Sequence, residues 1–263
     1  MMRVRPAGLL PLLSGILVSC QPPDGNKEEI LVFAAASLHD TVAVFADAFA
    51  EETGTRVKVN HGSSGGLARQ ILAAPRADLF LSAHPRWMDE IEEAGRLRPG
   101  TRIPFLRNQL AVVSHPDSPW KADDPALLAQ LDFRHLAIGD PAHVPAGTYA
   151  EEWMRSIALD GGETLWDRVK DQTIPTTTVR SALAQVRARR DTIGIVYRSD
   201  ALAFPEDVHV VCLVPMAEGP DIVYPAAILA DAPNPEGAQQ FLDYLQSSRA
   251  AVTWHEAGFF FAP

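Results

Sequence analysis

Cysteine is scarce in this sequence, which has two in 263 residues, Cys20 and Cys212. Cys20 ends the N-terminal apolar segment, so Cys212 is the only cysteine in the rest of the sequence. A disulfide framework is therefore excluded. Cys212 lies in a strand-like run at residues 208–214, where we interpret it as a buried, unreactive thiol. The histidines and cysteines show no H-x3-H or C-x2-C spacing. This excludes the common zinc sites.

Basic side chains are also few. There are 23 Lys and Arg against 33 Asp and Glu, which gives a net charge of −10. Affinity for DNA or RNA comes largely from neutralisation of phosphates by Lys and Arg, so we expect no nucleic-acid partner. Any anion that this acidic chain binds has to be held by local hydrogen-bond donors.

A hydrophobic run long enough for a membrane span is missing from the N-terminal segment. The apolar stretch at residues 7–18 is interrupted by Pro11 and Gly15, and it is shorter than the roughly 20 residues that a spanning helix needs. Arg3 and Arg5 precede this stretch. A basic start followed by a short apolar run is typical of a secretory signal peptide.

The tetrapeptide LVSC at residues 17–20 resembles the bacterial lipobox, in which the cysteine is lipidated and becomes the new N-terminus. We predict a lipoprotein signal peptide at residues 1–19, a lipid anchor on Cys20 and a polar tether at residues 20–29. The protein is then expected on the periplasmic or cell-surface side of a membrane. An ordinary signal peptide cut elsewhere remains the alternative.

From residue 30 onward, short β-like runs alternate with segments of helical periodicity. The pattern predicts three successive βα units, which favour a mainly parallel sheet flanked by helices. The predicted strands are 30–35, 56–60 and 77–82, and the helices are 38–52, 67–72 and 85–94. The second half has the same style without an internal repeat: strands near 110–113, 136–139, 194–196, 208–214 and 222–229, with helices at 179–188 and 235–246.

Small and hydroxylated residues follow these strands. Ser37 follows the first strand, the pair Ser63 and Ser64 follows the second, residues 145–147 follow the strand that ends at Gly139, and Val179 opens a helix. Ligands of open α/β sheets bind beyond the carboxyl ends of strands, where helix N-termini point. The sequence therefore predicts a binding site from these segments.

The same segments resemble the periplasmic molybdate-binding proteins, the ModA-type receptors of ABC importers. The matching motifs occur in the family's order and span nearly the whole mature chain: VFAAASL at 32–38, the serines 63–64 with LARQ at 67–70, ADLFLSA at 77–83 with WMD at 87–89, IGDPAHVPAG at 138–147 and GIVYRSD at 194–200. The sequence departs from the family at residues 61–62 and 65–66, because HG and GG stand in a loop that is rich in Ser and Thr elsewhere. A ligand role for these neighbours is left open.

The resemblance implies a type II periplasmic-binding-protein fold of two α/β lobes with mainly parallel sheets and a ligand cleft between them. Residues 30–107 and about 222–263 would form lobe 1, and residues about 108–221 would form lobe 2. The oxyanion would be held by hydroxyl and backbone N–H groups of the first lobe and by backbone N–H groups and a phenol of the second. The implied contacts are Ser37, Ser64, Ala146, Val179 and Tyr197.

The implied function is that of an extracytoplasmic receptor that delivers molybdate, and tungstate, to an ABC permease in the cytoplasmic membrane. No reaction, no cofactor and no metal ligated by protein atoms are implied, and we expect a monomer. The chemistry agrees, since a deprotonated oxyanion has only acceptors and needs a shell of donors. Helix N-termini supply such donors and partial positive charge without Lys or Arg. Phosphate is disfavoured because it keeps a proton near neutral pH.

Two other functions remain open at this point. Residues 62–66 satisfy G-x-S-x-G between a strand and a helix, which would make Ser64 a hydrolase nucleophile with His255 as a base. The same fold could also hold another oxyanion, such as sulfate. Each site residue also has a structural interpretation: Ser37 and Ser64 as helix N-caps, Asp140 and His143 as turn residues, and Arg69 and Arg180 as solvated or ion-paired cations.

Overall fold

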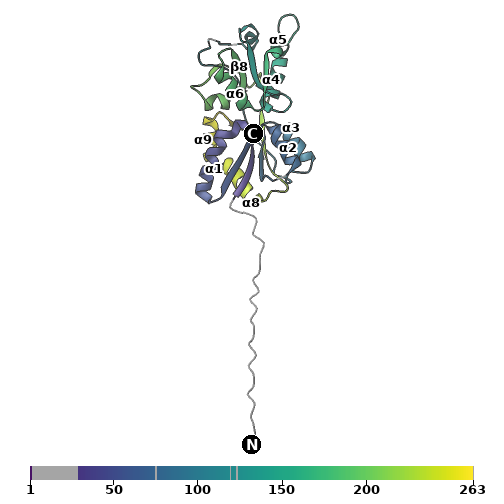
Figure 1. Ribbon diagram of the computed structural model, residues 1–263, viewed down its shortest axis with the longest axis vertical. Helices are drawn as coiled ribbons and strands as arrows, with labels where there is room; N and C mark the ends of the chain where they lie inside the picture. The colour runs from purple at the N-terminus through teal and green to yellow at the C-terminus, as the bar shows by residue number, and fades with distance from the viewer. Residues whose placement is uncertain (2–28, 75, 119, 123, 263) are drawn as a thin grey trace.

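The computed structural model describes residue 1 and residues 29–74, 76–118, 120–122 and 124–262. The described part of the chain from residue 29 on forms two α/β bodies stacked end to end (Figure 1). The predicted signal peptide, Cys20 and nearly all of the tether lie outside the described residues.

Lobe 1 contains a six-stranded sheet with the order β11-β4-β10-β3-β1-β2. Its strands are β1 (Glu29–Ala35), β2 (Arg56–Gly62), β3 (Leu79–Leu81), β4 (Ile103–Arg107), β10 (Val223–Ile228) and β11 (Phe260–Phe261). Its helices are the 3-10 turn η1 (Ala36–Leu38), α1 (His39–Thr53), α2 (Ser64–Ala73), α3 (Pro85–Glu93), α8 (Pro235–Leu245) and α9 (Ser248–Glu256).

Alternate residues of β1 face opposite sides of this sheet, as the two-residue repeat of a strand requires. Val32 packs in the cluster that includes Phe45 and Phe49 of α1 and Phe241 of α8. Phe33 packs in the other cluster, with side chains of α2 and α3. Figure 1 accordingly shows α2 and α3 on one side of the sheet, and α1, α8 and α9 on the other. Because both faces are buried, the strand is apolar from Ile30 to Ala35.

Lobe 2 contains a five-stranded sheet with the order β7-β6-β8-β5-β9. Its strands are β5 (Leu110–Ser114), β6 (His135–Gly139), β7 (Thr173–Thr176), β8 (Thr192–Tyr197) and β9 (His209–Leu213). Its helices are η2 (Pro125–Gln130), α4 (Pro145–Ser156), α5 (Leu165–Val169), η3 (Lys170–Gln172), α6 (Val179–Ala188) and α7 (Arg198–Ala203).

The expected two-lobed α/β architecture is confirmed, but both sheets are mixed and not mainly parallel. In lobe 1, β1 pairs in parallel with β2 and β3, whereas β10 is antiparallel to β3 and β4. In lobe 2, β6 is parallel to β7 and β8, and β5 is antiparallel to β8 and β9. The strands β5 and β10, by which the chain enters one lobe from the other, make these antiparallel pairs. The chain passes from β4 to β5 through Asn108 and Gln109, and from β9 to β10 through residues 214–222.

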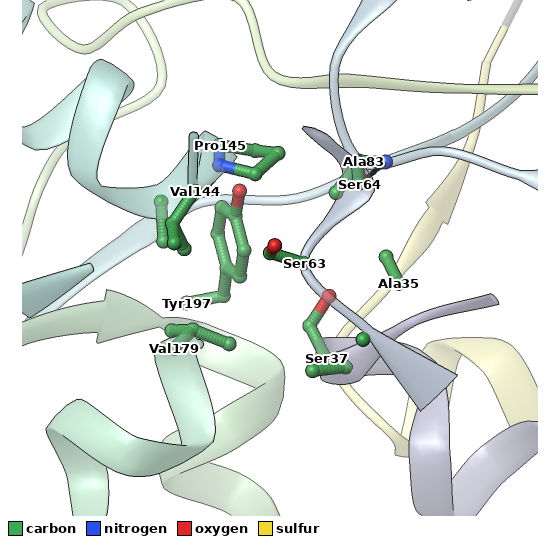
Figure 2. A pocket seen from close by; sticks show the side chains of 12 residues that line it. Ala35, Ser37, Ser63, Ser64, Ala83, Val144, Pro145, Val179 and Tyr197 are labelled. Carbon is green, nitrogen blue, oxygen red and sulfur yellow. Dashed lines mark hydrogen bonds between the residues drawn. The ribbon is translucent and has the colours of Figure 1, made fainter. Parts of the chain in front are cut away.

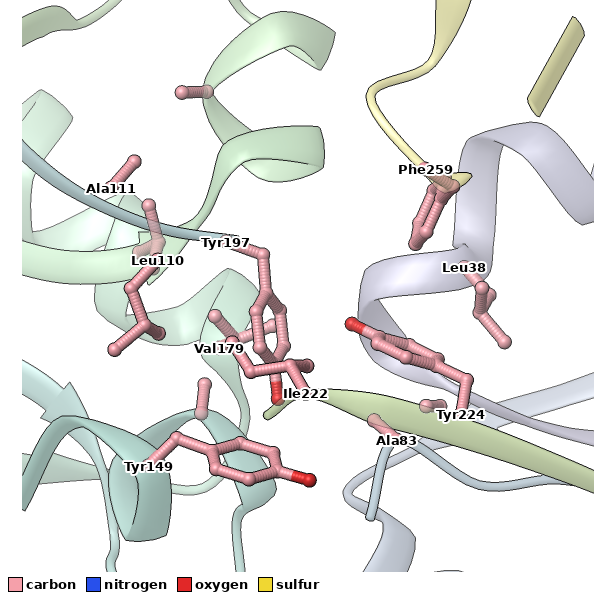
Figure 3. Packing of buried hydrophobic residues seen from close by; sticks show 14 of the residues in the cluster. Leu38, Ala83, Leu110, Ala111, Tyr149, Val179, Tyr197, Ile222, Tyr224 and Phe259 are labelled. Carbon is pink, nitrogen blue, oxygen red and sulfur yellow. The ribbon is translucent and has the colours of Figure 1, made fainter. Parts of the chain in front are cut away.

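Asn108 joins the two lobes where the chain crosses between them. Its buried side-chain amide donates to Ser199 Oγ at 2.9 Å in lobe 2 and to the Tyr224 hydroxyl at 3.2 Å in lobe 1. The ring of Tyr224 meets the ring of Tyr197 edge-on, with centroids 5.7 Å apart (Figure 3). Buried side chains of both lobes therefore form one continuous cluster.

Cys212 lies on β9 and is only half-buried, so the expectation of a buried thiol is met in part. Burial raises the pKa of its thiol to about 11. The thiolate is the reactive form, and the thiol therefore stays protonated and unreactive at neutral pH.

Candidate functional site between the lobes

A small cavity lies where the lobes meet (Figure 2). All five residues expected to contact a ligand line this cavity. The lining residues of lobe 1 are Ala35, Ala36, Ser37, Gly62, Ser63, Ser64 and Ala83, and those of lobe 2 are Val144, Pro145, Ala146, Val179 and Tyr197. The fold thus brings together residues that are far apart in the sequence.

Helix N-termini from both lobes open onto the cavity. Ser64 and Val179 are the first residues of α2 and α6, and Ala146 is the second residue of α4. Ser37 lies in the 3-10 turn that leads into α1. Backbone N–H groups of a first helical turn have no acceptor within the helix. They give the cavity several donors and a partial positive charge.

Ser64 is completely buried, and its Oγ accepts a hydrogen bond from the Ala83 backbone N–H at 2.9 Å. The hydroxyl proton therefore remains for a group inside the cavity. Ser64 is not the N-cap of α2, because the preceding Ser63 has that role: its Oγ accepts from Gly66 N at 3.2 Å. The capping interpretation thus belongs to Ser63.

Ser37 is oriented by a chain of hydrogen bonds that the sequence did not reveal. Its Oγ lies 3.0 Å from the hydroxyl of Tyr224, which accepts from the Asn108 amide. An amide NH₂ only donates. When the Tyr224 hydroxyl donates its hydrogen bond to Ser37 Oγ, the Ser37 hydroxyl is free to donate into the cavity. No motif in the sequence marks Tyr224 or Asn108, and only the meeting of the two lobes gives them this function.

Tyr197 ends β8 and is 1% exposed. Within the described part of the chain its hydroxyl has no hydrogen-bond partner. Burial raises the pKa of this phenol well above its ordinary value, so it remains protonated. A buried donor without an acceptor is costly, so an acceptor inside the cavity would stabilise this hydroxyl.

None of the residues that line the cavity is Lys or Arg. Arg180, the second residue of α6, is ion-paired as expected, with Asp40 at 2.7 Å and Asp200 at 2.8 Å. Arg69 lies exposed on α2. The cavity wall therefore contains no charged side chain and presents hydroxyl and amide donors.

Asp140 and His143 have the turn role expected of them. Asp140 Oδ1 accepts from the Ala142 backbone N–H at 3.0 Å, and Oδ2 lies 3.2 Å from His143 Nδ1. Within the described residues, no group of three or more His, Cys, Asp and Glu is placed to hold a metal ion.

Gly65, in the loop that departs from the Ser/Thr-rich pattern, lies at a close contact between the lobes. A Cβ at this position would stand 2.7 Å from the backbone oxygen of His143 in lobe 2 and 2.7 Å from the Trp87 ring. Ordinary carbon contacts are about 3.5–4.0 Å. The missing side chain lets α2 approach the loop before α4.

The bacterial extracellular solute-binding protein family model matches residues 30–260. The chain belongs to this family. The Escherichia coli molybdate-binding protein ModA is 37% identical to this solute-binding protein over 89% of the chain and 90% of the relative. A Bacillus subtilis putative ABC transporter substrate-binding lipoprotein, YvgL, is 29% identical over 94% and 93%. These matches confirm the resemblance to the molybdate-binding receptors.

A solved structure gives the same result for the fold. The Azotobacter vinelandii periplasmic molybdate-binding protein matches with a TM-score of 0.79 at 22% identity, over 89% of this chain and all of that one. Solute-binding proteins of ABC importers work outside the cytoplasm and hold their ligand without a cofactor. Among the residues that the structure describes, no helix is both long and apolar enough to cross a membrane.

The hydrolase interpretation of Ser64 is wrong, because the matching family consists of binding proteins and not of enzymes. The structure agrees with this conclusion. His255 lies exposed on α9, with its ring against Phe260, and it does not line the cavity that contains Ser64. The G-x-S-x-G pattern arises here from a helix start that needs glycine for close packing.

Proposed function

We propose that this solute-binding protein captures molybdate and tungstate in the cavity between its lobes and delivers them to an ABC-type permease in the cytoplasmic membrane. The observation that carries the proposal is the cavity wall without charged side chains, which combines hydroxyl donors with the first turns of α2, α4 and α6. A fully deprotonated oxyanion offers only acceptors to such a wall. An oxyanion that keeps a proton would place an O–H against another donor.

The proposed contacts are the hydroxyl and backbone N–H groups of Ser37 and Ser64, the backbone N–H groups of Ala146 and Val179, and the phenol of Tyr197. They come from both lobes, so the anion would join residues 30–107 and 222–263 to residues 108–221 as one closed unit. The closed form would be the one that the permease recognises.

Isothermal titration of the purified protein with molybdate, tungstate, sulfate and phosphate tests the proposal. We expect tight one-to-one binding of the first two anions and weak or no binding of the others. If sulfate bound more tightly than molybdate, sulfate would be the transported anion. If none of the four anions bound, the protein would not be an oxyanion receptor.

The same titration with Ser64→Ala tests the contacts. Loss of a hydrogen bond to a charged acceptor weakens binding by roughly 1–3 kcal/mol, which is about fivefold to more than a hundredfold in Kd. Ser247→Ala is the matched control, because it removes the serine cap of α9 at a cost of about 1 kcal/mol in stability, and Ser247 does not line the cavity. Equal affinity of Ser64→Ala and the unmodified protein would exclude Ser64 from the contacts.

We also propose that Cys20 is lipidated and anchors the protein to a membrane as a monomer. Support comes from the lipobox-like LVSC sequence at residues 17–20 and from the lipoprotein name of the Bacillus subtilis relative. Metabolic labelling with a radioactive fatty acid should mark the protein but not Cys20→Ala, and labelling of both would place the lipid elsewhere.

A further inference from the structure

The carboxylates of Asp40 and Asp200 both pair with Arg180, beside the cavity but outside its wall. Arg180 Nη2 lies 2.7 Å from Asp40 Oδ2, and Arg180 Nε lies 2.8 Å from Asp200 Oδ1. Arg180 and Asp200 belong to lobe 2, on α6 and α7, whereas Asp40 lies in the first turn of α1 in lobe 1. One of the two ion pairs therefore crosses between the lobes.

Each member of this trio lies within one turn of a residue that lines the cavity. Arg180 directly follows Val179, and Asp40 lies three residues after Ser37. Asp200 Oδ2 accepts a hydrogen bond from the backbone N–H of Tyr197 at 3.2 Å. The trio is thus connected through short stretches of backbone to the parts of the cavity wall that each lobe contributes.

The two ion pairs differ in how permanent they are. The Asp200 side chain is 0% exposed, and a buried carboxylate needs its partner whether or not a ligand is present. Arg180 is held further by the ring of Phe204, 5.1 Å from its guanidinium carbon. Asp40 is 50% exposed and has a second partner in its own lobe, His39 Nδ1 at 2.9 Å. It can therefore leave Arg180 when the lobes separate.

We propose that Arg180 is a positioning residue that latches the lobes through Asp40 when an oxyanion fills the cavity. Arg180 does not touch the ligand, and its charge is balanced by carboxylates, so it does not attract the anion. It slows the opening of the loaded form instead. This inference rests on the proposed function, since it requires an anion in the cavity.

Asp40→Asn tests the latch, because it keeps the shape of the side chain and removes its charge. We expect molybdate to dissociate about 1.4-fold to fivefold faster, the range of a partly exposed ion pair, with an association rate within about twofold of the unmodified protein. The matched control is Asp47→Asn, which makes the same charge change on an exposed residue two turns further along α1. The control should leave both rates unchanged.

Thermal unfolding with and without molybdate separates a latch from a general structural role. Asp40→Asn should unfold at the same temperature as the unmodified protein when empty and at a lower temperature when loaded, and Asp40→Glu should restore the slow dissociation. Equal destabilisation of the empty and loaded forms, or an unchanged dissociation rate, would overturn the latch while leaving the proposed function intact. Failure of the unmodified protein to bind any oxyanion would overturn both.

Discussion

The Tyr197 hydroxyl gives a residue-scale prediction, since it is buried and lacks a partner among the described residues. Tyr197→Phe keeps the ring packed against Tyr224 and removes only the donor. The affinity for molybdate should fall by about 1.5–3 kcal/mol, while the free energy of unfolding of the empty protein changes by less than about 1 kcal/mol. Titration calorimetry and urea unfolding measure the two quantities.

Tyr149→Phe is the control for this prediction. The Tyr149 hydroxyl is also buried, and its ring stacks on His84 of lobe 1 with the centroids 4.7 Å apart, but Tyr149 does not line the cavity. Its affinity should stay close to that of the unmodified protein. If both variants lost affinity equally, the effect would come from the interface between the lobes and not from ligand contact.

At the scale of elements, the start of α2 is shaped to meet lobe 2. Gly65→Ala should weaken molybdate binding by tenfold or more, because the new Cβ would stand 2.7 Å from the His143 backbone oxygen and from the Trp87 ring, and overpacking of this kind costs about 1–3 kcal/mol. Gly66→Ala, one residue later, would meet only the Ser63 hydroxyl, at 2.9 Å. If calorimetry gave the same affinity for Gly65→Ala and Gly66→Ala, Gly65 would have no specific role in closure of the lobes.

The elements also show what the sequence could predict. The apolar run of β1 and the periodic helix α1 were expected close to where they occur, because burial on two faces and on one face leave different patterns. Three strands lie outside the predicted ones. β4 and β7 each contain a proline, Pro104 and Pro175, which argues against a strand in sequence reasoning, and β11 has only two residues.

For the site, the sequence predicted residues at the ends of strands but not those that orient them. Ser37 and Ser64 follow strands, so they could be expected at the edge of a sheet. Tyr224 and Asn108 are different, because their role depends on how the two lobes meet. No local pattern records that arrangement. The family resemblance was needed to add Tyr197 to the serines, residues 145–147 and Val179.

At the scale of the whole molecule, His61 makes stability depend on pH. Burial, followed by the charge of His39, lowers the pKa of His61 to about 4, with Asp40 and Arg180 also nearby. A histidine in the unfolded chain titrates near 6.5. Between these two pH values the unfolded state binds more protons, so the contribution of His61 to stability is complete above about pH 6.5 and is lost as the pH falls toward 4.

His61→Gln should therefore gain stability relative to the unmodified protein as the pH is lowered from 6.5 to 4. Unfolding temperatures of both proteins at each pH provide the measurement. The comparison is needed because burial raises the pKa of Asp200 to about 6, which acts in the opposite direction in both proteins. A difference that stays constant with pH would show that His61 titrates normally in the folded protein.

The passage from β4 to β5 consists of Asn108 and Gln109, whereas β9 and β10 are separated by residues 214–222. Two extended residues reach about 7 Å, so the lobes cannot drift apart at this point, whatever occupies the cavity. The longer connection, residues 214–222, allows the lobes to rotate about the shorter connection at Asn108 and Gln109. A link this short fixes the distance between the lobes at one point and leaves rotations about it, so the cavity opens by a rotation of the lobes and not by their separation.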